Sequence, residues 1–113
     1  AHGAGLSAIW ISWAKYVYLQ APERFARFGR NVLGIAGGTD AEADALETIE
    51  AMRRFFRSID MPTNFAELGI HPTEDQIEEM TVKATFWGKR TLGQVMVLGK
   101  NQIKAIYELA AQP

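Results

Sequence analysis

The sequence predicts an all-α fold, a bundle of about five helices with a buried apolar first helix. Three observations support this class: an apolar stretch near the start has helical spacing, helix-capping signals recur, and the connections between periodic segments are short. The β-prone run at 95–98 has no partner strand elsewhere in the sequence, so we interpret 89–98 as a loop. Helices joined by short connections pack as a bundle.

The first helix is expected over residues 4–20. Leu6, Ile9, Trp10 and Trp13 recur at helical spacing, and small or apolar residues fill the other side. The only charge in this stretch is a single lysine near its end. Because a helix that is apolar all round must be buried on every face, we expect it at the centre of the bundle.

A second helix is expected to begin at Pro22, since the missing N–H of a proline has no helical partner to lose in the first turn. The residues predicted for its inner face are Phe25, Phe28, Gly29 and Val32. Three arginines on the outer side could form a phosphate-binding patch or a solvated face. The formal net charge of -1 and the adjacent Glu23 favour the solvated face.

The third helix is expected to start where Thr39 and Glu42 have the spacing of a capping box. Its buried stripe is predicted to consist of Leu46, Ile49, Met52, Phe56 and Ile59. The carboxylates predicted to be exposed on it are Asp44, Glu47 and Glu50. They could suggest acid–base chemistry or a metal site, but no histidine has a compatible spacing, so we interpret them as surface charges.

Capping signals also define the remaining elements. Asn64 and Glu67 predict a single turn at 65–68, which Gly69 ends. A capping box at Thr73 predicts a fourth helix, whose buried face is expected to comprise Ile77, Met80, Ala84 and Trp87 before a stop at Gly88. The last helix is expected at about 100–111, with Ile103, Ile106, Tyr107 and Ala110 pointing inward.

Composition narrows the classes of function. A length of 113 residues corresponds to one domain, and a net charge of -1 gives no attraction to nucleic acid or to an anionic membrane. The absence of cysteine excludes disulfides and thiolate chemistry and is compatible with the cytoplasm. No uncharged run is long enough for a transmembrane helix, and we recognise no signal peptide. The chain does not begin with methionine, and we expect it to be a fragment of a larger protein.

The residues HGAGL at 2–6, followed by an apolar helix, resemble a segment of the iron-containing (group III) alcohol dehydrogenases, and specifically of their butanol dehydrogenase branch. The resemblance continues through PERFA at 22–26, FF at 55–56, MPT at 61–63, ELGI at 67–70 and IKAIY at 103–107. It therefore covers nearly the whole chain. It implies that 1–113 is the metal-binding side of the helical C-terminal domain of a larger dehydrogenase.

The resemblance also implies a metal role for His2. In this family the corresponding histidine is the last of four metal ligands, an aspartate and three histidines, and it opens a helix of the C-terminal domain. A neutral imidazole suits divalent iron or zinc, and such a metal can polarise an alcohol oxygen before hydride transfer. Without the resemblance, a lone histidine near a terminus is more often a surface or core residue.

What the family implies for a parent enzyme is the NAD(P)-dependent interconversion of primary alcohols and aldehydes. Its expected partners are the missing N-terminal nucleotide-binding domain, a small alcohol or aldehyde substrate and a second copy in a homodimer. The other metal ligands and a glycine-rich cofactor segment do not occur in these residues. We therefore expect the isolated chain to be inactive and to bind neither metal nor cofactor tightly.

Two further interpretations concern weaker features of the sequence. In the resembling family, the loop before the last helix lies near the substrate pocket, which makes Trp87, Lys89 and Arg90 pocket candidates, against the alternative of a solvated connecting loop. The other histidine, His71, precedes a proline and is interpreted as a loop residue. An alternative function from a different class is a stand-alone helical module that binds a protein partner through an exposed apolar face.

Overall fold

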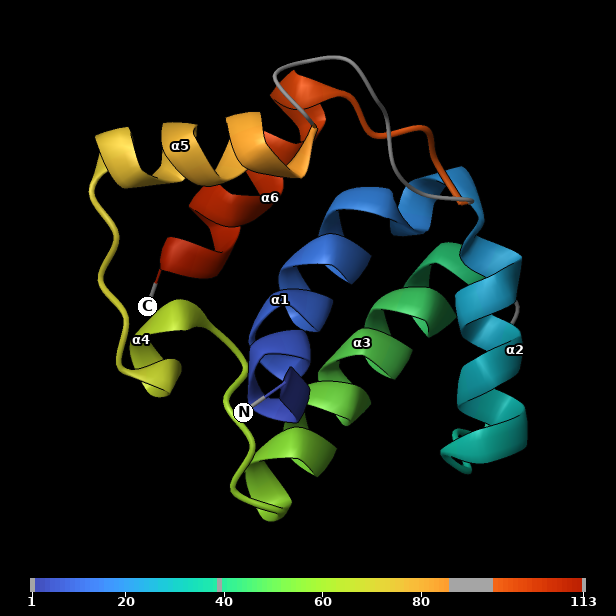
Figure 1. Ribbon diagram of the computed structural model, residues 1–113. Helices are drawn as coiled ribbons and strands as arrows, with labels where there is room; N and C mark the ends of the chain where they lie inside the picture. The colour runs from blue at the N-terminus through green and yellow to red at the C-terminus, as the bar shows by residue number, and fades with distance from the viewer. Residues whose placement is uncertain (1, 39, 86–94, 113) are drawn as a thin grey trace.

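The computed structural model describes residues 2–38, 40–85 and 95–112 (Figure 1). The helices within these ranges are α1 (His2–Val17), a 3-10 turn η1 (Tyr18–Gln20), α2 (Pro22–Val32), α3 (Ala41–Ser58), α4 (Phe65–Leu68), α5 (Glu74–Ala84) and α6 (Lys100–Ala111). The all-α prediction is confirmed, with five longer helices at the predicted places and α4 as the predicted single turn. None of the described helices is both long and apolar enough to cross a membrane.

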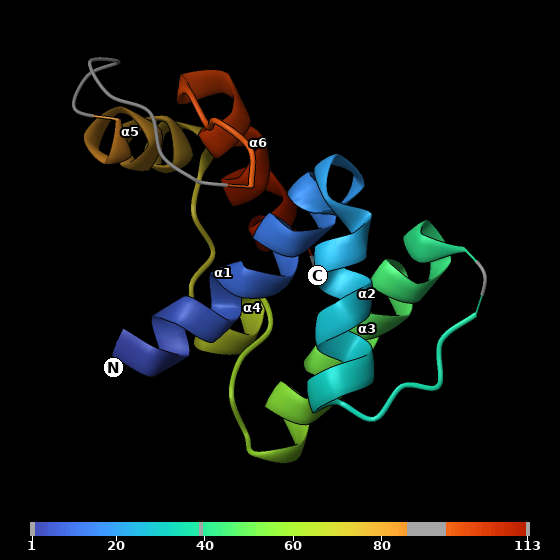
Figure 2. The same ribbon diagram turned by 90° about the vertical axis from the view of Figure 1, so that its right-hand side faces the viewer.

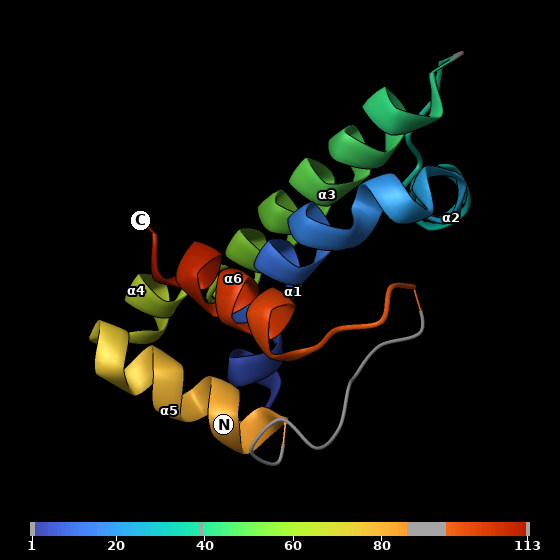
Figure 3. The ribbon, with the colours of Figure 1, turned by 90° about the horizontal axis from the view of Figure 1, so that it is seen from above.

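The first helix, α1, lies at the centre of the arrangement (Figure 1). It contacts α3 on one side and α6 on another, and α4 packs against it as well (Figure 3). The outer helices have fewer neighbours: α2 packs extensively along α3, whereas α5 contacts the other described helices only through α6. The predicted central position of the first helix is therefore confirmed.

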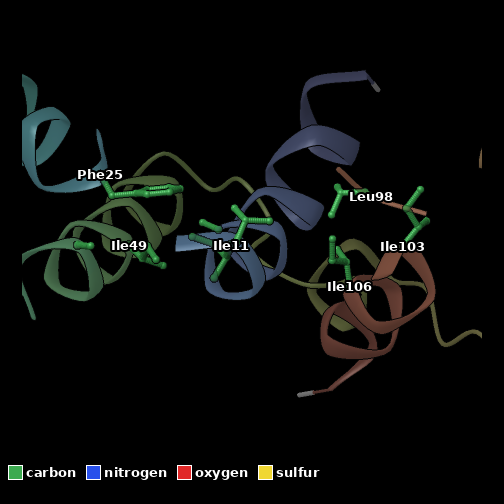
Figure 4. Close-up of a cluster of buried hydrophobic side chains, with 9 residues drawn as sticks. Ile11, Phe25, Ile49, Leu98, Ile103 and Ile106 are labelled. Carbon is green, nitrogen blue, oxygen red and sulfur yellow. The ribbon is translucent and has the colours of Figure 1, made fainter. Parts of the chain in front are cut away.

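The buried core follows from this order of helices. Ile11 of α1 lies between Ile49 of α3 on one side and Ile106 of α6 on the other (Figure 4). Ala14 and Val17, further along α1, have 0% of their surface exposed. The core is thus one continuous cluster that runs through α1 from the α2–α3 pair to α6.

The expectation that α1 is buried on every face is wrong at its first turns. Leu6 is 57% exposed, and the following turn η1 leaves Leu19 55% exposed. The fully buried residues of α1 are small or lie on the α3 and α6 sides, as Ala8 and Ile11 do. An apolar residue on every side of a helix allows burial on every side, but only the sides that face a neighbouring helix are covered.

The contact between α2 and α3 is close because a glycine lies in it. A Cβ added at Gly29 would overlap Oγ1 of Thr48 on α3, and Ala26 one turn earlier is also buried. The prediction for the inner face of α2 is therefore right at Phe25 and Gly29, which are buried, but wrong at Phe28 and Val32, which are 38% and 64% exposed. The close approach to Thr48 of α3 is thus made at Gly29, while Phe25 of the same helix packs into the core.

The predicted stripe on α3 is buried only in part. Ile49 is fully buried, and Met52 and Phe56 are half-buried against the core. Leu46 and Ile59 are 41% and 52% exposed, contrary to the prediction. Because α2 and α1 contact α3 from different directions, its buried surface includes Thr48 and Ala45 beside Ile49 rather than a single line of large residues.

Asp44 was expected at the surface, but the structure buries it. Both of its carboxylate oxygens accept a hydrogen bond from the backbone N–H of Gly38 at 2.9 Å, and Arg30 lies 3.9 Å away. Only 6% of Asp44 is exposed. The carboxylate therefore anchors the loop between α2 and α3, and the expectation of a solvated carboxylate is wrong.

The predicted N-caps of α4 and α5 are confirmed, whereas the cap of α3 lies one residue later than predicted. The side chain of Asp40, rather than Thr39, caps α3 by accepting a hydrogen bond from the backbone N–H of Glu42 at 3.1 Å. Thr39 itself lies outside the described residues. The capping box of Thr73 and Gln76 at the start of α5 is confirmed. Trp87 and Gly88, expected to continue and end α5, also fall outside the described ranges.

We predict that Ile49→Ala lowers the free energy of unfolding by about 2–5 kcal/mol, because it leaves a cavity where α1, α2 and α3 meet. Ile59→Ala is the matched control on the same helix and should change it by about 0.5 kcal/mol or less, since Ile59 is half exposed. Urea unfolding followed by circular dichroism measures both. Equal losses in the two variants would contradict the packing described here.

Candidate metal-binding site

His2, the metal ligand implied by the sequence resemblance, is the first residue of α1. The prediction that this histidine stands at the entrance of the first helix is therefore confirmed. Its side chain lies outside the part of the structure that is described, so its role as a ligand stays a prediction. The description of the site is built from the backbone of α1 and from the segments beside it.

The first turn of α1 is open on one side. Figure 2 shows this end of the helix projecting beyond α2 and α3. A Cβ added at Gly3 would lie 3.5 Å from Cε of Met61, which is an ordinary contact, whereas one added at Gly5 would meet no described atom within 4 Å. The absence of a side chain at Gly5 thus leaves a surface beside His2 to which a ligand or another backbone can come close.

The segment next to this turn is held in place by Glu67. Its Oε1 accepts hydrogen bonds from the backbone N–H and the hydroxyl of Thr63, at 2.7 and 2.6 Å. Its Oε2 accepts a hydrogen bond from Arg57 of α3 at 3.1 Å. Asn64 caps α4 by accepting from the backbone N–H of Glu67 at 2.8 Å, as its spacing predicted. One carboxylate therefore ties the end of α3 to α4, on either side of Met61.

These hydrogen bonds also affect the ionisation of Glu67. The hydroxyl of Thr63 is the largest influence that lowers the pKa of this carboxyl below its usual value, and the Thr63 backbone N–H and Arg57 act in the same direction. Partial desolvation opposes them but does not outweigh them. The ionised form is consequently the one that the folded state favours.

The described residues do not form a metal site by themselves. No three side chains among the His, Cys, Asp and Glu residues of 3–38, 40–85 and 95–112 lie close enough together to hold an ion. A divalent metal bound through a single imidazole lacks most of the ligands that such sites use. His2 can supply at most one ligand of such a site, and the described residues offer no cluster that completes it.

An apolar cleft of about 290 Å³ opens further along α1. Its walls include Trp10, Trp13, Phe25 and Met52, and Val95 closes one side. The rings are in mutual contact, with the centroids of Trp13 and Phe25 5.9 Å apart. Sequence periodicity assigned both tryptophans to a buried face, whereas the structure places them at the edge of a hollow.

This cleft is not adjacent to His2. Trp10 lies eight positions after His2, which corresponds to about 12 Å along the axis of a helix. A short alcohol held at a metal on His2 would not extend into the cleft. The predicted pocket residues Trp87, Lys89 and Arg90 lie outside the described residues, and their role stays a prediction.

Comparison with known proteins establishes the class of this chain. Residues 1–111 match the family model described as the Fe-containing alcohol dehydrogenase family, C-terminal. Because the match covers nearly the whole sequence, the chain belongs to this family, and the resemblance found in the sequence is confirmed.

The individual relatives are butanol dehydrogenases. NADH-dependent butanol dehydrogenase A of Clostridium acetobutylicum is 28% identical over 108 residues, which are 95% of this chain and 27% of that protein. The crystal structure of NADH-dependent butanol dehydrogenase A from Thermotoga maritima matches with a TM-score of 0.83 and 31% identity, covering 99% of this chain and 29% of the other. The chain thus spans less than a third of the length of these relatives.

We predict that Glu67→Gln makes the stability less dependent on pH in acid. Because folding lowers the pKa of Glu67, its contribution is fully present above the unfolded value near 4.5 and is lost as the pH falls through the lower folded value. The wild-type chain should therefore lose more stability than the variant between neutral pH and pH values below 4.5.

Urea unfolding at several pH values measures this difference. The matched control is Glu47→Gln, which removes an exposed carboxylate of α3 that makes no ion pair with the described residues. A constant gap between wild type and Glu67→Gln at all pH values would show that the hydrogen bonds of Glu67 do not depend on its charge.

Proposed function

We propose that the chain is the helical, metal-binding side of an NAD(P)-linked dehydrogenase that interconverts primary alcohols and aldehydes. The observation that supports this most directly is the family match over residues 1–111, which includes His2 at the start of α1. Both relatives are named as NADH-dependent butanol dehydrogenases, which favours a short primary alcohol and a nicotinamide cofactor. The chain would act within a larger enzyme, because it spans less than a third of those proteins.

In this proposal His2 donates one imidazole nitrogen to a divalent iron or zinc ion. Such a metal, when bound, acts as a Lewis acid that polarises the oxygen of the alcohol. The contribution of this chain is to place the imidazole. α1 is held between α3 and α6 over most of its length, and the Glu67 network supports the segment beside its first turn. The packing of the middle of α1 fixes the direction in which the helix presents its first residue.

The remaining parts of the proposed enzyme lie outside the described residues. We propose that the other metal ligands and the nucleotide-binding domain belong to an N-terminal region, and that Trp87, Lys89 and Arg90 border the substrate pocket. A homodimer and a cytoplasmic location are further parts of the proposal. Exposed apolar side chains such as Leu6 are better explained by packing inside a larger enzyme than by a stand-alone interaction module, because the chain belongs to an enzyme family.

We predict that His2→Ala, made in the full-length parent enzyme, removes the metal and the activity. Loss of a group that only supports a metal ligand typically costs 10–100-fold in affinity or activity, so loss of a ligand should cost about that much or more. The measurements are metal content by mass spectrometry and the rate of NADH formation with butanol. The matched control is His71→Ala, which removes the exposed loop histidine before Pro72.

A second measurement separates a ligand from a structural histidine. In the 113-residue chain, His2→Ala should change the free energy of unfolding by about 0.5 kcal/mol or less, because the first turn of α1 is open. A parent variant that keeps its metal and turnover would overturn the assignment of His2.

We also predict that the chain alone neither oxidises butanol nor binds metal tightly, because one imidazole cannot replace a complete ligand set. Titration calorimetry with Zn²⁺ and with NADH measures binding directly. Stoichiometric binding of Zn²⁺ at micromolar concentration would mean that the metal site is complete without the rest of the enzyme.

A further inference from the structure

A polar pocket of about 170 Å³ lies where α1, α3, the start of α4 and the end of α6 meet. Three cationic side chains line it: Lys15 of α1, and Arg53 and Arg57 of α3. No aspartate or glutamate is among the residues that line it. The apolar cleft beside Trp10 and Trp13, by contrast, is lined mainly by aromatic and apolar side chains.

The positive charge of the pocket is only partly neutralised from outside. Lys15 and Arg53 share one carboxylate, that of Glu50, at 3.3 and 3.4 Å. Arg57 pairs with Glu67 at 3.1 Å, and the other oxygen of Glu67 is occupied by Thr63. Three cations therefore pair with two carboxylates, and neither carboxylate lines the pocket.

Two residues that line the pocket carry a donor without a hydrogen bond to the described residues, and the donor of Arg53 is buried. The Nε–H of Arg53 is buried and has no hydrogen-bond partner among the described residues. Ser12, only 6% exposed, makes no side-chain hydrogen bond within the same ranges, whereas Ser7 on the same helix donates to the backbone carbonyl of Ala4. Buried donors are nearly always paired in folded proteins, so the unpaired Nε–H of Arg53 indicates a missing acceptor. The hydroxyl of Ser12 is a second donor available to that acceptor.

We propose that this pocket binds a small oxyanion, the phosphate or carboxylate group of a small molecule. Such a group offers several acceptor oxygens, which suits the Nε–H of Arg53 and the hydroxyl of Ser12 together. The planar guanidinium of arginine matches the spacing of these oxygens, and Lys15 and Arg57 add attraction from two sides. The excess of one positive charge is balanced when the anion enters.

The site lies apart from the position of the proposed metal, although Arg57 and Thr63 also belong to the Glu67 network. Ser12 lies ten positions after His2, about 15 Å along the helix axis, so an anion here does not reach a metal on His2. The proposal therefore stands or falls separately from the metal role of His2.

The test is a titration of the ¹⁵N-labelled 113-residue chain with sodium phosphate and, separately, with sodium acetate, at constant ionic strength set by sodium chloride. We expect saturable shifts of the amide resonances of Ser12 and Arg53 with one or both anions. The anion that binds more tightly identifies the class of ligand. Shifts that do not saturate, or that chloride alone reproduces, would overturn the proposal.

Two variants assign the binding to this pocket. Arg53→Gln should weaken the apparent affinity by about tenfold or more, because it removes the charge and the buried donor together. Arg54→Gln is the matched control: the same change at the next position of α3, where the side chain is exposed and does not line the pocket. Affinity should be unchanged in that variant.

Ser12→Ala keeps the helix and removes only the hydroxyl, so it tests the pocket even if Arg53→Gln does not fold. We expect several-fold weaker binding. Wild-type affinity in Ser12→Ala and, where it folds, in Arg53→Gln would place the anion elsewhere and overturn the inference.

Discussion

The burial of α1 between α3 and α6 is the contact on which the rest of the structure depends. It brings Ile11 against Ile49 on one side and Ile106 on the other, and so joins two pairs of helices into one core. Ala8 and Ala14 are fully buried, because small side chains let the neighbouring helices come close. The middle of α1 is therefore fixed, while its first turn remains free to meet other groups.

This arrangement separates the functional features along one helix. The candidate metal ligand His2 stands at the open end, beside Gly5 and the segment that Glu67 holds. The pocket with Lys15 and Ser12 lies toward the other end, where α3 and α6 approach. The helix keeps the two features at a constant distance, and Arg57 and Thr63 of the Glu67 network also line the pocket. The chain belongs to the Fe-containing alcohol dehydrogenase family, and the proposed metal role of His2 at the open end rests on that membership.

Local signals in the sequence predicted most helix boundaries, because caps and prolines act through the nearest backbone groups. The starts at Pro22, Asn64 and Thr73 are examples. Periodicity was less informative about burial. It predicted that Val32 is buried and Asp44 exposed, whereas the structure shows the reverse, since the sequence does not say from which direction a neighbouring helix approaches. The anion pocket was missed for the same reason, because its cations come from two helices and have no common spacing. His2 carries no local signal at all, and only the family resemblance singled it out.

The attachment of α5 has a consequence for how the molecule responds to its solvent. Among the described helices α5 touches only α6, and Glu78 lies between Lys100 and Lys104 at 2.9 and 3.0 Å in that contact. Dissolved ions weaken such solvent-exposed attractions, whereas they leave apolar packing intact. High ionic strength should thus loosen α5 before it affects α1, α2 and α3, which makes α5 the part of the fold most responsive to salt.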